Sequence, residues 1–278
     1  MHLGYNTNGL AHHSLPAAIE LLAELGYRSV AITLDHCALN PYGENLQREL
    51  RETAALLEKH NFRSVVETGA RYLLDPRTKH EPTLVTADEG GRLRRIDFLK
   101  RAIDVAAELH SDCVSLWSGV VRHSAGRDQA RAHLAGGLRR VLDYAEQREV
   151  TIGFEPEPGM LIDTMASFDE LLQHVDSSRL GLTLDVGHLH CLGETPIAGA
   201  IRQWGDRLVN VHIEDMRTGV HEHLKFGEGE MDFPPIIAAL AEVGYDGGLH
   251  VELSRHSHDG PRAAKQAYKF LAPLLADS

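Results

Sequence analysis

The chain has 278 residues, of which 43% are hydrophobic and 24% are charged, and its formal net charge is −12. Single α/β barrels run to about 250 residues, so we expect one domain over residues 1–278 with a core that needs no disulfide or structural metal. The acidic balance disfavours a nucleic-acid partner, which needs a basic face, and without a run of about 18 apolar residues the sequence predicts no membrane span.

Short apolar segments alternate with longer amphipathic segments along the chain. The predicted strands are His2–Asn6, Ser29–Leu34, Arg63–Glu67, Cys113–Trp117, Thr151–Glu155, Gly181–Asp185, Leu208–Ile213 and Gly248–Leu253. The predicted helices are Pro16–Leu25, Asn45–His60, Arg92–Leu109, Ala130–Glu149, Ser167–Val175, Pro196–Trp204, Pro234–Val243 and Pro261–Leu275. Apolar strands in strict alternation with helices favour the α/β class and a single closed (β/α)8 TIM barrel. Since no G-x-G-x-x-G follows a predicted strand, a dinucleotide-binding fold has little support.

Three longer connections follow predicted strands: Thr68–Gly91, Pro156–Ala166 and Glu214–Phe233. In a barrel, a connection that follows a strand lies at the C-terminal mouth, where barrel enzymes build their active sites. We therefore expect the functional loops to be among these three.

The cysteines and the first residues bear on the compartment. Cys37, Cys113 and Cys191 have neither disulfide-framework nor zinc-site spacing. The segment MHLGYNTNGLAHHS has no cationic start followed by an apolar stretch, so it does not resemble a signal peptide. These features predict a cytoplasmic protein.

The last four predicted strands each carry an acid or an imidazole near the C-terminal end. These residues are Glu155, Asp185, His212 and Glu252. A single such residue is usually a helix cap, a solvated charge or a hydrogen-bonded core histidine, but here the pattern occurs on four consecutive strands. Three converging carboxylates would repel one another unless a cation neutralised them. The oxygen-rich donor set suits one Mn2+, Mg2+ or Co2+ ion, with Zn2+ as a further option.

Four motifs in the second half of the chain carry a resemblance to a known family. The motifs LDVGH, VHIED, FGEGEMDFPPII and GYDGGLHVELS resemble the xylose-isomerase-like barrel superfamily. Within it, the sugar-phosphate isomerase/epimerase branch is most similar, which includes ketose 3-epimerases, hydroxypyruvate isomerases and inosose-processing enzymes. The resemblance implies a small carbohydrate or cyclitol as substrate and a homodimer or homotetramer.

The resemblance also implies roles for individual residues. Glu155, Asp185, His212 and Glu252 are expected to bind the metal, and Glu155 and Glu252 are expected to be the catalytic pair that moves protons. His188 would hydrogen-bond a substrate hydroxyl, and Arg217 would clamp substrate oxygens. Glu157 has the same parity as Glu155 along a strand, so either could be the ligand; Pro156 and Pro158 suggest that the strand has ended and favour Glu155.

These roles predict a divalent-metal-dependent isomerase or epimerase of a keto sugar or keto-cyclitol that acts through an enediolate. One carboxylate removes the proton beside the carbonyl and the other returns a proton. Return to the opposite face of the same carbon is epimerisation, and return to the neighbouring carbon is isomerisation. A dehydratase or lyase would use the same metal site.

Two histidines support an alternative function. His221 and His223 precede the FGEGE motif at the spacings at which the apurinic-endonuclease branch of the same superfamily binds further zinc ions, so they are candidate additional metal ligands and point to a zinc-dependent phosphohydrolase. That branch has a histidine where this chain has Trp117, so one expected ligand is missing. A barrel that serves only as a binding subunit is a further alternative, against which the four retained ligands argue.

Three other residues are candidates for substrate contact. Glu67 ends the segment VVETG and either reaches a distal hydroxyl or hydrogen-bonds neighbouring loops. Trp117 would form an apolar wall for the substrate ring. His256 follows the last strand and is expected near the substrate.

Overall fold

The computed structural model describes residues 1–122 and 126–276 and forms a closed parallel barrel. In barrel order, its strands are β1 (His2–Asn6), β10 (Gly248–Val251), β7 (Leu208–Ile213), β6 (Leu180–Asp185), β5 (Ile152–Phe154), β4 (Val114–Leu116), β3 (Arg63–Glu67) and β2 (Ser29–Thr33). This order confirms the predicted (β/α)8 architecture. It also makes β5, β6, β7 and β10 immediate neighbours.

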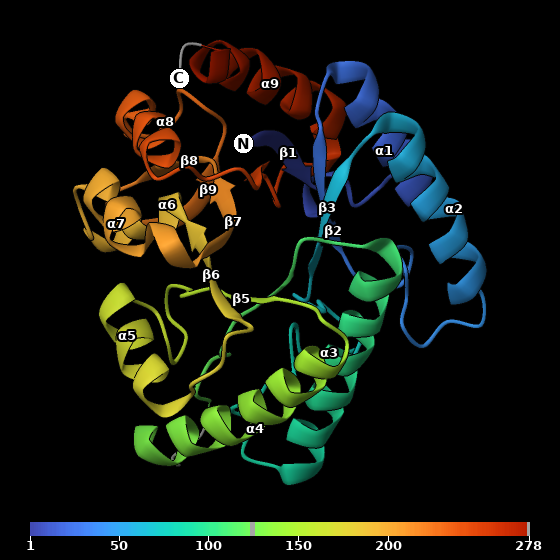
Figure 1. The fold of residues 1–278 in the computed structure, drawn as a ribbon, viewed down its shortest axis with the longest axis vertical. Coiled ribbons are helices and arrows are strands. Elements are labelled where there is room, and N and C mark those ends of the chain that lie inside the picture. Colours follow the sequence, from blue (N-terminus) through green and yellow to red (C-terminus); the bar gives the residue numbers. More distant parts are fainter. Residues whose placement is uncertain (123–125, 277–278) are drawn as a thin grey trace.

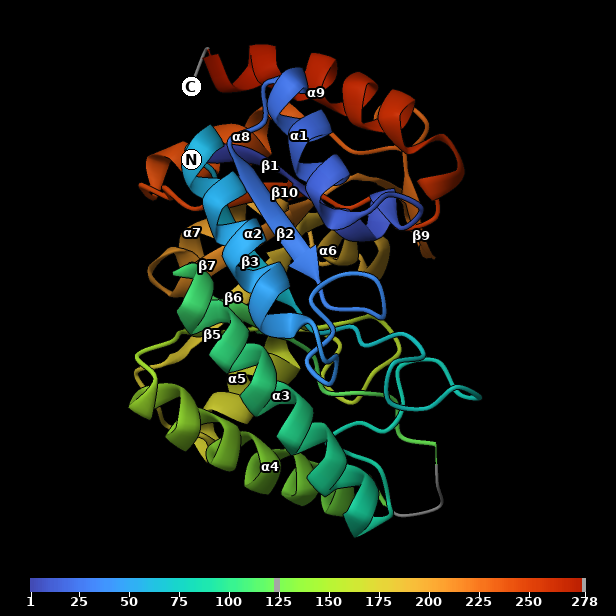
Figure 2. The same ribbon diagram turned by 90° about the vertical axis from the view of Figure 1, so that its right-hand side faces the viewer.

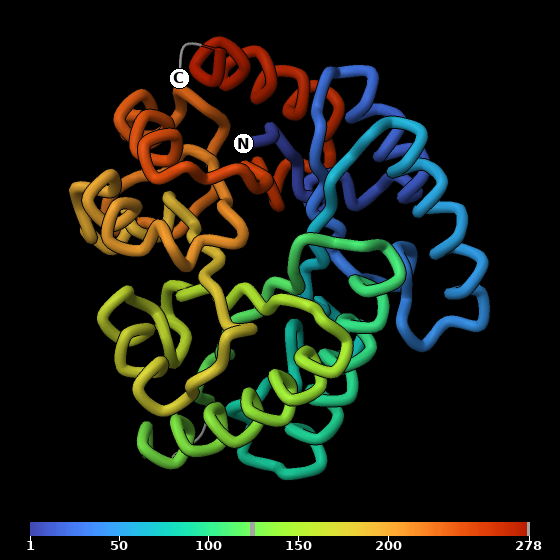
Figure 3. Tube along the Cα trace, in the orientation of Figure 1, coloured from blue at the N-terminus to red at the C-terminus, as the bar shows by residue number. Residues whose placement is uncertain are grey.

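Helices surround the strands, as Figure 1 shows. They are α1 (Leu15–Leu25), α2 (Leu46–His60), α3 (Glu89–Leu109), α4 (Arg127–Gln147), α5 (Met165–His174), α6 (Val186–Leu192), α7 (Ile197–Trp204), α8 (Phe233–Glu242) and α9 (Gly260–Ala276). The view turned by 90° shows α1, α2 and α3 along one side of the barrel (Figure 2). The trace in Figure 3 follows the ring in chain order and brings α9 back beside α1.

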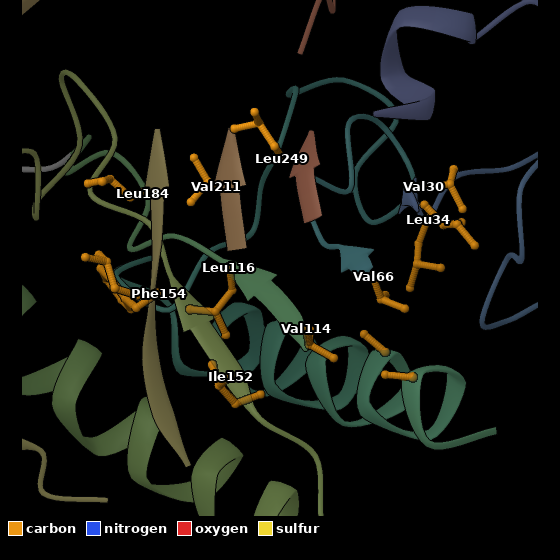
Figure 4. Close-up of a cluster of buried hydrophobic side chains, with 14 of the residues drawn as sticks. Val30, Leu34, Val66, Val114, Leu116, Ile152, Phe154, Leu184, Val211 and Leu249 are labelled. Carbon is orange, nitrogen blue, oxygen red and sulfur yellow. The ribbon is translucent and has the colours of Figure 1, made fainter. Parts of the chain in front are cut away.

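Apolar side chains fill the layer between strands and helices. Val211 of β7 and Leu249 of β10 are paired in register and are fully buried (Figure 4). Because side chains alternate along a strand, the neighbours of Val211 on either side, Asn210 and His212, face the barrel interior instead. The same alternation turns His250 inward, and it places polar groups inside a barrel whose outer layer is apolar.

A short helix and a two-stranded hairpin lie in segments where the sequence predicted only connections. The short helix α6 begins directly after Asp185, whose side chain caps it by accepting a hydrogen bond from the backbone nitrogen of His188. The antiparallel hairpin β8 (Asp215–Arg217) and β9 (Val220–Leu224) occupies the predicted connection after β7. Both are too short for a periodic apolar pattern to reveal them.

Elsewhere, the predicted helices and strands match the observed ones with ends that differ by three residues or fewer. In the two described stretches of the chain, no helix has the length and apolar character required to cross a membrane.

Candidate metal centre and cavity

The four predicted ligands converge at the C-terminal mouth of the barrel. Glu155 directly follows β5, Asp185 ends β6, His212 lies in β7 and Glu252 directly follows β10. We call these residues the acid–His set. One side-chain donor atom from each lies within 4.8 Å of the donor atoms of the other three. Because four adjacent strands end at the same level, a pattern that is spread over almost 100 residues of sequence becomes one cluster.

His212 is at the centre of the set. Its Nδ1 atom lies 3.0 Å from Oε1 of Glu155 and 2.9 Å from Oε2 of Glu252. Burial alone would lower the pKa of His212, but the carboxylates of Glu67, Glu155 and Glu252 raise it well above its ordinary value. The imidazolium therefore occupies, in this structure, the electrostatic position of a cation.

The carboxyl groups respond unequally to this environment. Burial raises the pKa of Glu155 to about 7, although His212 favours the carboxylate. Burial would also raise the pKa of Glu252, but attraction to His212 outweighs it and lowers the pKa. The pKa of Glu157 is raised well above its ordinary value by burial and by its carboxylate neighbours Glu155 and Glu252. Such crowding of acids is the electrostatic signature of a cation site or of shared protons.

The donor set fits a divalent metal ion. Within the described part of the chain, Oδ2 of Asp185 is buried and has no hydrogen-bond partner, although Nε2 of His188 lies 3.4 Å away, whereas Oδ1 of the same residue accepts from the His188 backbone. A buried carboxylate oxygen without a partner is costly unless a cation or a proton compensates it. Three carboxylates and one imidazole also match the ligand preferences of Mn2+, Mg2+ and Co2+.

A cavity of about 550 Å³ opens over the acid–His set. Its lining includes Glu155, His212 and Glu252 and also, among the other predicted site residues, Glu67, Trp117, His221 and His223. Asn6, Asn8, Thr33, Arg71, Lys79, His80, Glu157, Arg255 and His258 line it as well. The volume is in the range of small-molecule pockets.

Trp117 forms part of the cavity wall and is firmly held. The guanidinium of Arg95 lies 4.6 Å from the centre of its ring, and the ring of His80 packs edge-on against it. Arg95 is fully buried and donates a hydrogen bond of 2.7 Å to the carbonyl of Thr68. The wall is thus fixed from behind by a buried cation.

Glu67 lines the cavity, but its carboxylate bonds to side chains of the barrel interior and not to a neighbouring loop. Its Oε1 atom lies 2.9 Å from Nε2 of His212 and 3.1 Å from Nδ2 of Asn210. It is therefore in contact with the proposed ligand histidine, on the side of the ring opposite the other carboxylates.

Three predicted substrate contacts lie outside the cavity lining formed by the described residues. His188 is buried beside the acid–His set, and its Nδ1 donates to the carbonyl of Pro156 at 3.2 Å. Arg217 is exposed on β8 and donates to the carbonyl of Glu228. The ring of His256 turns toward the carbonyl of His223. After β10, Ser254, Arg255, Ser257 and His258 face the cavity instead.

The histidine cluster of His188, His221 and His223 adjoins the acid–His set. One ring nitrogen from each lies within 4.8 Å of the others. In the described residues, Nε2 of His188 and Nε2 of His221 are buried without hydrogen-bond partners. The hairpin β8–β9 therefore positions the two histidines beside a third that follows β6.

Glu214 is a functional candidate that the sequence analysis missed. It is fully buried, its carboxylate lies 3.6 Å from Nδ1 of His223, and burial followed by the charge of Asp185 raises its pKa well above the ordinary value. Gly187 of the LDVGH motif leaves room for it, because a Cβ atom there would collide with the Glu214 carboxyl group. The signal that could have identified it is an acid two residues after His212, at the same parity along the strand.

Asp215 explains the FGEGE motif. Its side chain accepts hydrogen bonds from the backbone nitrogens of Met216, Gly227, Gly229 and Met231, at 2.8 to 3.2 Å. One buried carboxylate therefore closes the loop that follows the hairpin onto the end of β7.

Comparison with known proteins identifies the family to which the chain belongs. The model of the family described as xylose isomerase-like TIM barrel matches residues 19–274. The uncharacterised protein MJ1311 of Methanocaldococcus jannaschii is 29% identical over 240 residues, covering 74% of this chain and 80% of that protein. L-ribulose-5-phosphate 3-epimerase UlaE of Salmonella paratyphi C is 24% identical over 262 residues, covering 92% and 89%.

Solved structures agree on the fold. The structure of the IolI protein with a bound zinc atom superposes with a TM-score of 0.79 at 21% sequence identity, covering 100% of this chain and 99% of that one. At that identity, the likeness concerns the arrangement of the barrel.

Proposed function

The chain belongs to the xylose isomerase-like TIM barrel family, and on this premise we propose that it is a divalent-metal-dependent epimerase or isomerase of a keto sugar or keto-cyclitol. The supporting observation is the acid–His set, whose donor atoms lie within 4.8 Å of one another and three of whose members, Glu155, His212 and Glu252, line the cavity. A sugar 3-epimerase among the relatives supports the same class of reaction.

The acid–His set would hold the metal ion. When bound, a divalent ion supplies Lewis-acid stabilisation of the negative charge that develops on the substrate oxygens. The buried Asp185 oxygen without a partner and the oxygen-rich donors favour Mn2+, Mg2+ or Co2+. Zn2+ is compatible with the same donors and is the ion in the related IolI structure.

Glu155 and Glu252 would carry the proton transfers. One carboxylate takes the proton from the carbon beside the ketone, and the C–H electron pair forms the enediolate double bond as the carbonyl oxygen gains negative charge. The other group, as a carboxylic acid, returns a proton to the opposite face of that carbon, so the product is the epimer. Both groups line the cavity and both lie within 3.0 Å of the same His212 nitrogen, so they flank one point.

The cavity also has positive groups that suit an anionic substrate. Arg71 and Lys79 from the loop after β3, and Arg255 after β10, line it together with the acids. We propose that they receive the phosphate of a phosphorylated ketose, as the name of the UlaE relatives suggests. L-ribulose 5-phosphate and L-ribulose are therefore the matched pair of substrates to compare.

The test of the proposal is solvent hydrogen exchange. The protein is stripped of metal by chelation, reloaded with Mn2+, and incubated with each ketopentose in D2O. We expect deuterium at the carbon beside the ketone with the loaded protein only. Hydrolysis or dehydration without exchange into recovered substrate, or full activity after chelation, would contradict a metal-dependent epimerase.

The histidine cluster supports a second candidate function. Its buried nitrogens without partners could ligate additional zinc ions through His221 and His223. A zinc-dependent phosphohydrolase would then bind two or more zinc ions per chain and release phosphate from phosphate esters. One tightly bound ion per chain, measured by elemental analysis after dialysis against zinc, would exclude this candidate.

A further inference from the structure

We propose that Glu67 is a positioning residue that fixes which ring nitrogen of His212 is available to the metal, and that a buried chain of polar side chains holds Glu67 in this role. The inference rests on the proposed function, because it concerns the ligand histidine of that site. It assigns to Glu67 a task other than the substrate contact that its place on the barrel rim suggested.

The buried row of hydrogen bonds consists of four side chains, each from a different strand. From the bottom of the barrel toward the site they are Ser29 of β2, His250 of β10, Asn210 of β7 and Glu67 of β3. The Ser29 hydroxyl lies 2.8 Å from Nε2 of His250, and Nδ1 of His250 lies 2.7 Å from Oδ1 of Asn210. Asn210 then donates to Glu67, and Glu67 contacts His212. We call these four residues the interior chain.

The direction of the hydrogen bonds follows from chemistry. The amide oxygen of Asn210 can only accept, so the ring of His250 must donate to it from Nδ1. The amide nitrogen of Asn210 can only donate, so Oε1 of Glu67 accepts from it at 3.1 Å. Nε2 of His250 is then left to accept the Ser29 hydroxyl. Nδ2 of Asn210 also lies 3.1 Å from Nε2 of His212. These two nitrogens do not bond each other in this scheme, because both donate to the same oxygen, Oε1 of Glu67.

Glu67 therefore imposes a proton on Nε2 of His212. Its Oε1 atom lies 2.9 Å from that nitrogen, a distance at which a carboxylate and an unprotonated ring nitrogen would bring two lone pairs together. With Nε2 held protonated, the proton that the imidazolium gives up when a metal binds is the one on Nδ1, and Nδ1 is the atom that faces Glu155 and Glu252. A carboxylate behind a ligand histidine orients the ring and strengthens metal binding in many metal sites.

Burial makes the arrangement rigid. Ser29, Asn210 and His250 are completely buried, and Glu67 is 7% exposed. Because these side chains are buried, water cannot replace a lost partner. Leaving one of their polar groups without a hydrogen bond costs about 1–3 kcal/mol. The interior chain thus couples the barrel floor to the orientation of one ligand.

The test compares metal binding in variants of the purified full-length chain. Mn2+ is titrated into wild type, Glu67→Gln, Asn210→Ala and the control Thr183→Val, and free Mn2+ is followed by its EPR signal. Thr183 is a fully buried interior residue of β6 that hydrogen-bonds Ser115 at 3.2 Å and is outside the interior chain. We expect Glu67→Gln to raise the Mn2+ dissociation constant by about 10–100-fold, Asn210→Ala to raise it less, and Thr183→Val to leave it unchanged.

A second readout reports the tautomer directly. In Mg2+-loaded protein labelled with 15N-histidine, the wild type should show a His212 signal with the proton on Nε2, and Glu67→Gln should lose or shift that signal. Unchanged Mn2+ affinity in Glu67→Gln, or an equal loss in Thr183→Val, would overturn the inference. If Glu67→Gln does not fold, Glu67→Asp and Asn210→Ala decide by the same titration.

The Mn2+ titration distinguishes a failure of the proposed function from a failure of the role assigned to Glu67. A wild-type protein that does not bind Mn2+ would contradict the proposed function. A wild-type protein that binds Mn2+, with a Glu67→Gln variant that binds it equally well, would contradict only the role of Glu67.

Discussion

The two halves of the barrel face the same cavity with different chemistry. In the second half, β5, β6, β7 and β10 supply the acid–His set at their ends. In the first half, the strands supply Asn6, Thr33 and Glu67, and the charged groups Arg71, Lys79 and His80 come from the loop after β3. Proposed reacting groups on strand ends are held rigidly, whereas groups on loops can vary in sequence without disturbing the barrel.

Histidines at the cavity and beside it also differ in their electrostatics. In the second half, His212 and His223 lie among carboxylates that raise their pKa values against the effect of burial. In the first half, burial and the nearby cations Lys79, Arg95 and Arg71 lower the pKa of His80 to about 4. Burial also lowers the pKa of His188, in the second half, to about 4. The contrast therefore separates the histidines for which carboxylate neighbours outweigh burial from those for which burial dominates, and cations line the cavity from both halves, Arg71 and Lys79 from the first and Arg255 from the second.

The largest expected effect would come from removing the second half's carboxylates. Glu155→Gln and Glu252→Gln should each lower kcat by roughly 10²-fold or more, the usual scale for a positioned acid or base. Exchange of the substrate proton with D2O, followed by NMR, measures the loss. Glu157→Gln is the matched control, because Glu157 lines the same cavity outside the acid–His set. A loss confined to Glu157→Gln would move the ligand assignment to that residue.

The next largest effect is expected from a hydrogen bond between the two halves, which holds a proposed catalytic carboxylate. Nδ2 of Asn8 donates a hydrogen bond of 2.7 Å to Oε1 of Glu252. Because a hydrogen bond to a charged group contributes about 1.5–3 kcal/mol, we expect Asn8→Ala to lower kcat by roughly tenfold or more while Mn2+ stays bound. Steady-state rates and a parallel Mn2+ titration give both quantities. Full activity in Asn8→Ala would show that the two halves act independently.

A smaller effect should distinguish substrate binding by the cations of the loop after β3 from catalysis by the carboxylates. Lys79→Met removes one positive charge from the cavity lining. We expect KM for L-ribulose 5-phosphate to rise several-fold, with KM for L-ribulose unchanged, because only the phosphorylated substrate carries the charge. Equal changes for both substrates would argue against a phosphate contact in the first half.

The smallest effect concerns stability and pH. His80 has a folded-state pKa of about 4, below its ordinary value of 6.5, so the unfolded chain binds its proton first as the pH falls. Its contribution to stability is complete above the ordinary pKa, falls as the pH drops through 6.5, and stops changing below 4. Thermal unfolding at pH 7.5 and pH 5 should show a smaller drop in Tm for His80→Asn than for wild type. An identical drop in both would mean that His80 is not the group that titrates.

Much of the fold was predictable from the sequence because periodicity is local. Apolar runs such as Leu208–Ile213 ended at the predicted residues, and the barrel was confirmed. Strand ends also identified the members of the cluster, since four neighbouring strands bring their last residues to one mouth. The hairpin β8–β9 was not predicted, because strands of three and five residues give too little pattern.

Contacts across the barrel were beyond prediction for a different reason. Glu67 and His212 are 145 residues apart, and their contact depends on the cross-section of the closed barrel. Asn210 and His250 did leave a signal, because each lies two residues before a proposed ligand and so shares its face. The cavity-facing residues after β10 depended on the path of a loop, which no sequence period determines.

The clamp made by Asp215 has an evolutionary consequence. Because this one carboxylate holds the backbone nitrogens of Gly227 and Gly229 to the end of β7, the hairpin between them is tied off at its base. We expect insertions at the exposed turn of the hairpin, residues 217–220, to leave the strand that bears His212 in place, whereas His221 and His223 pack beside the acid–His set. The segment is a natural unit of exchange, and transplanting it between homologues is a direct way to diversify what the barrel recognises.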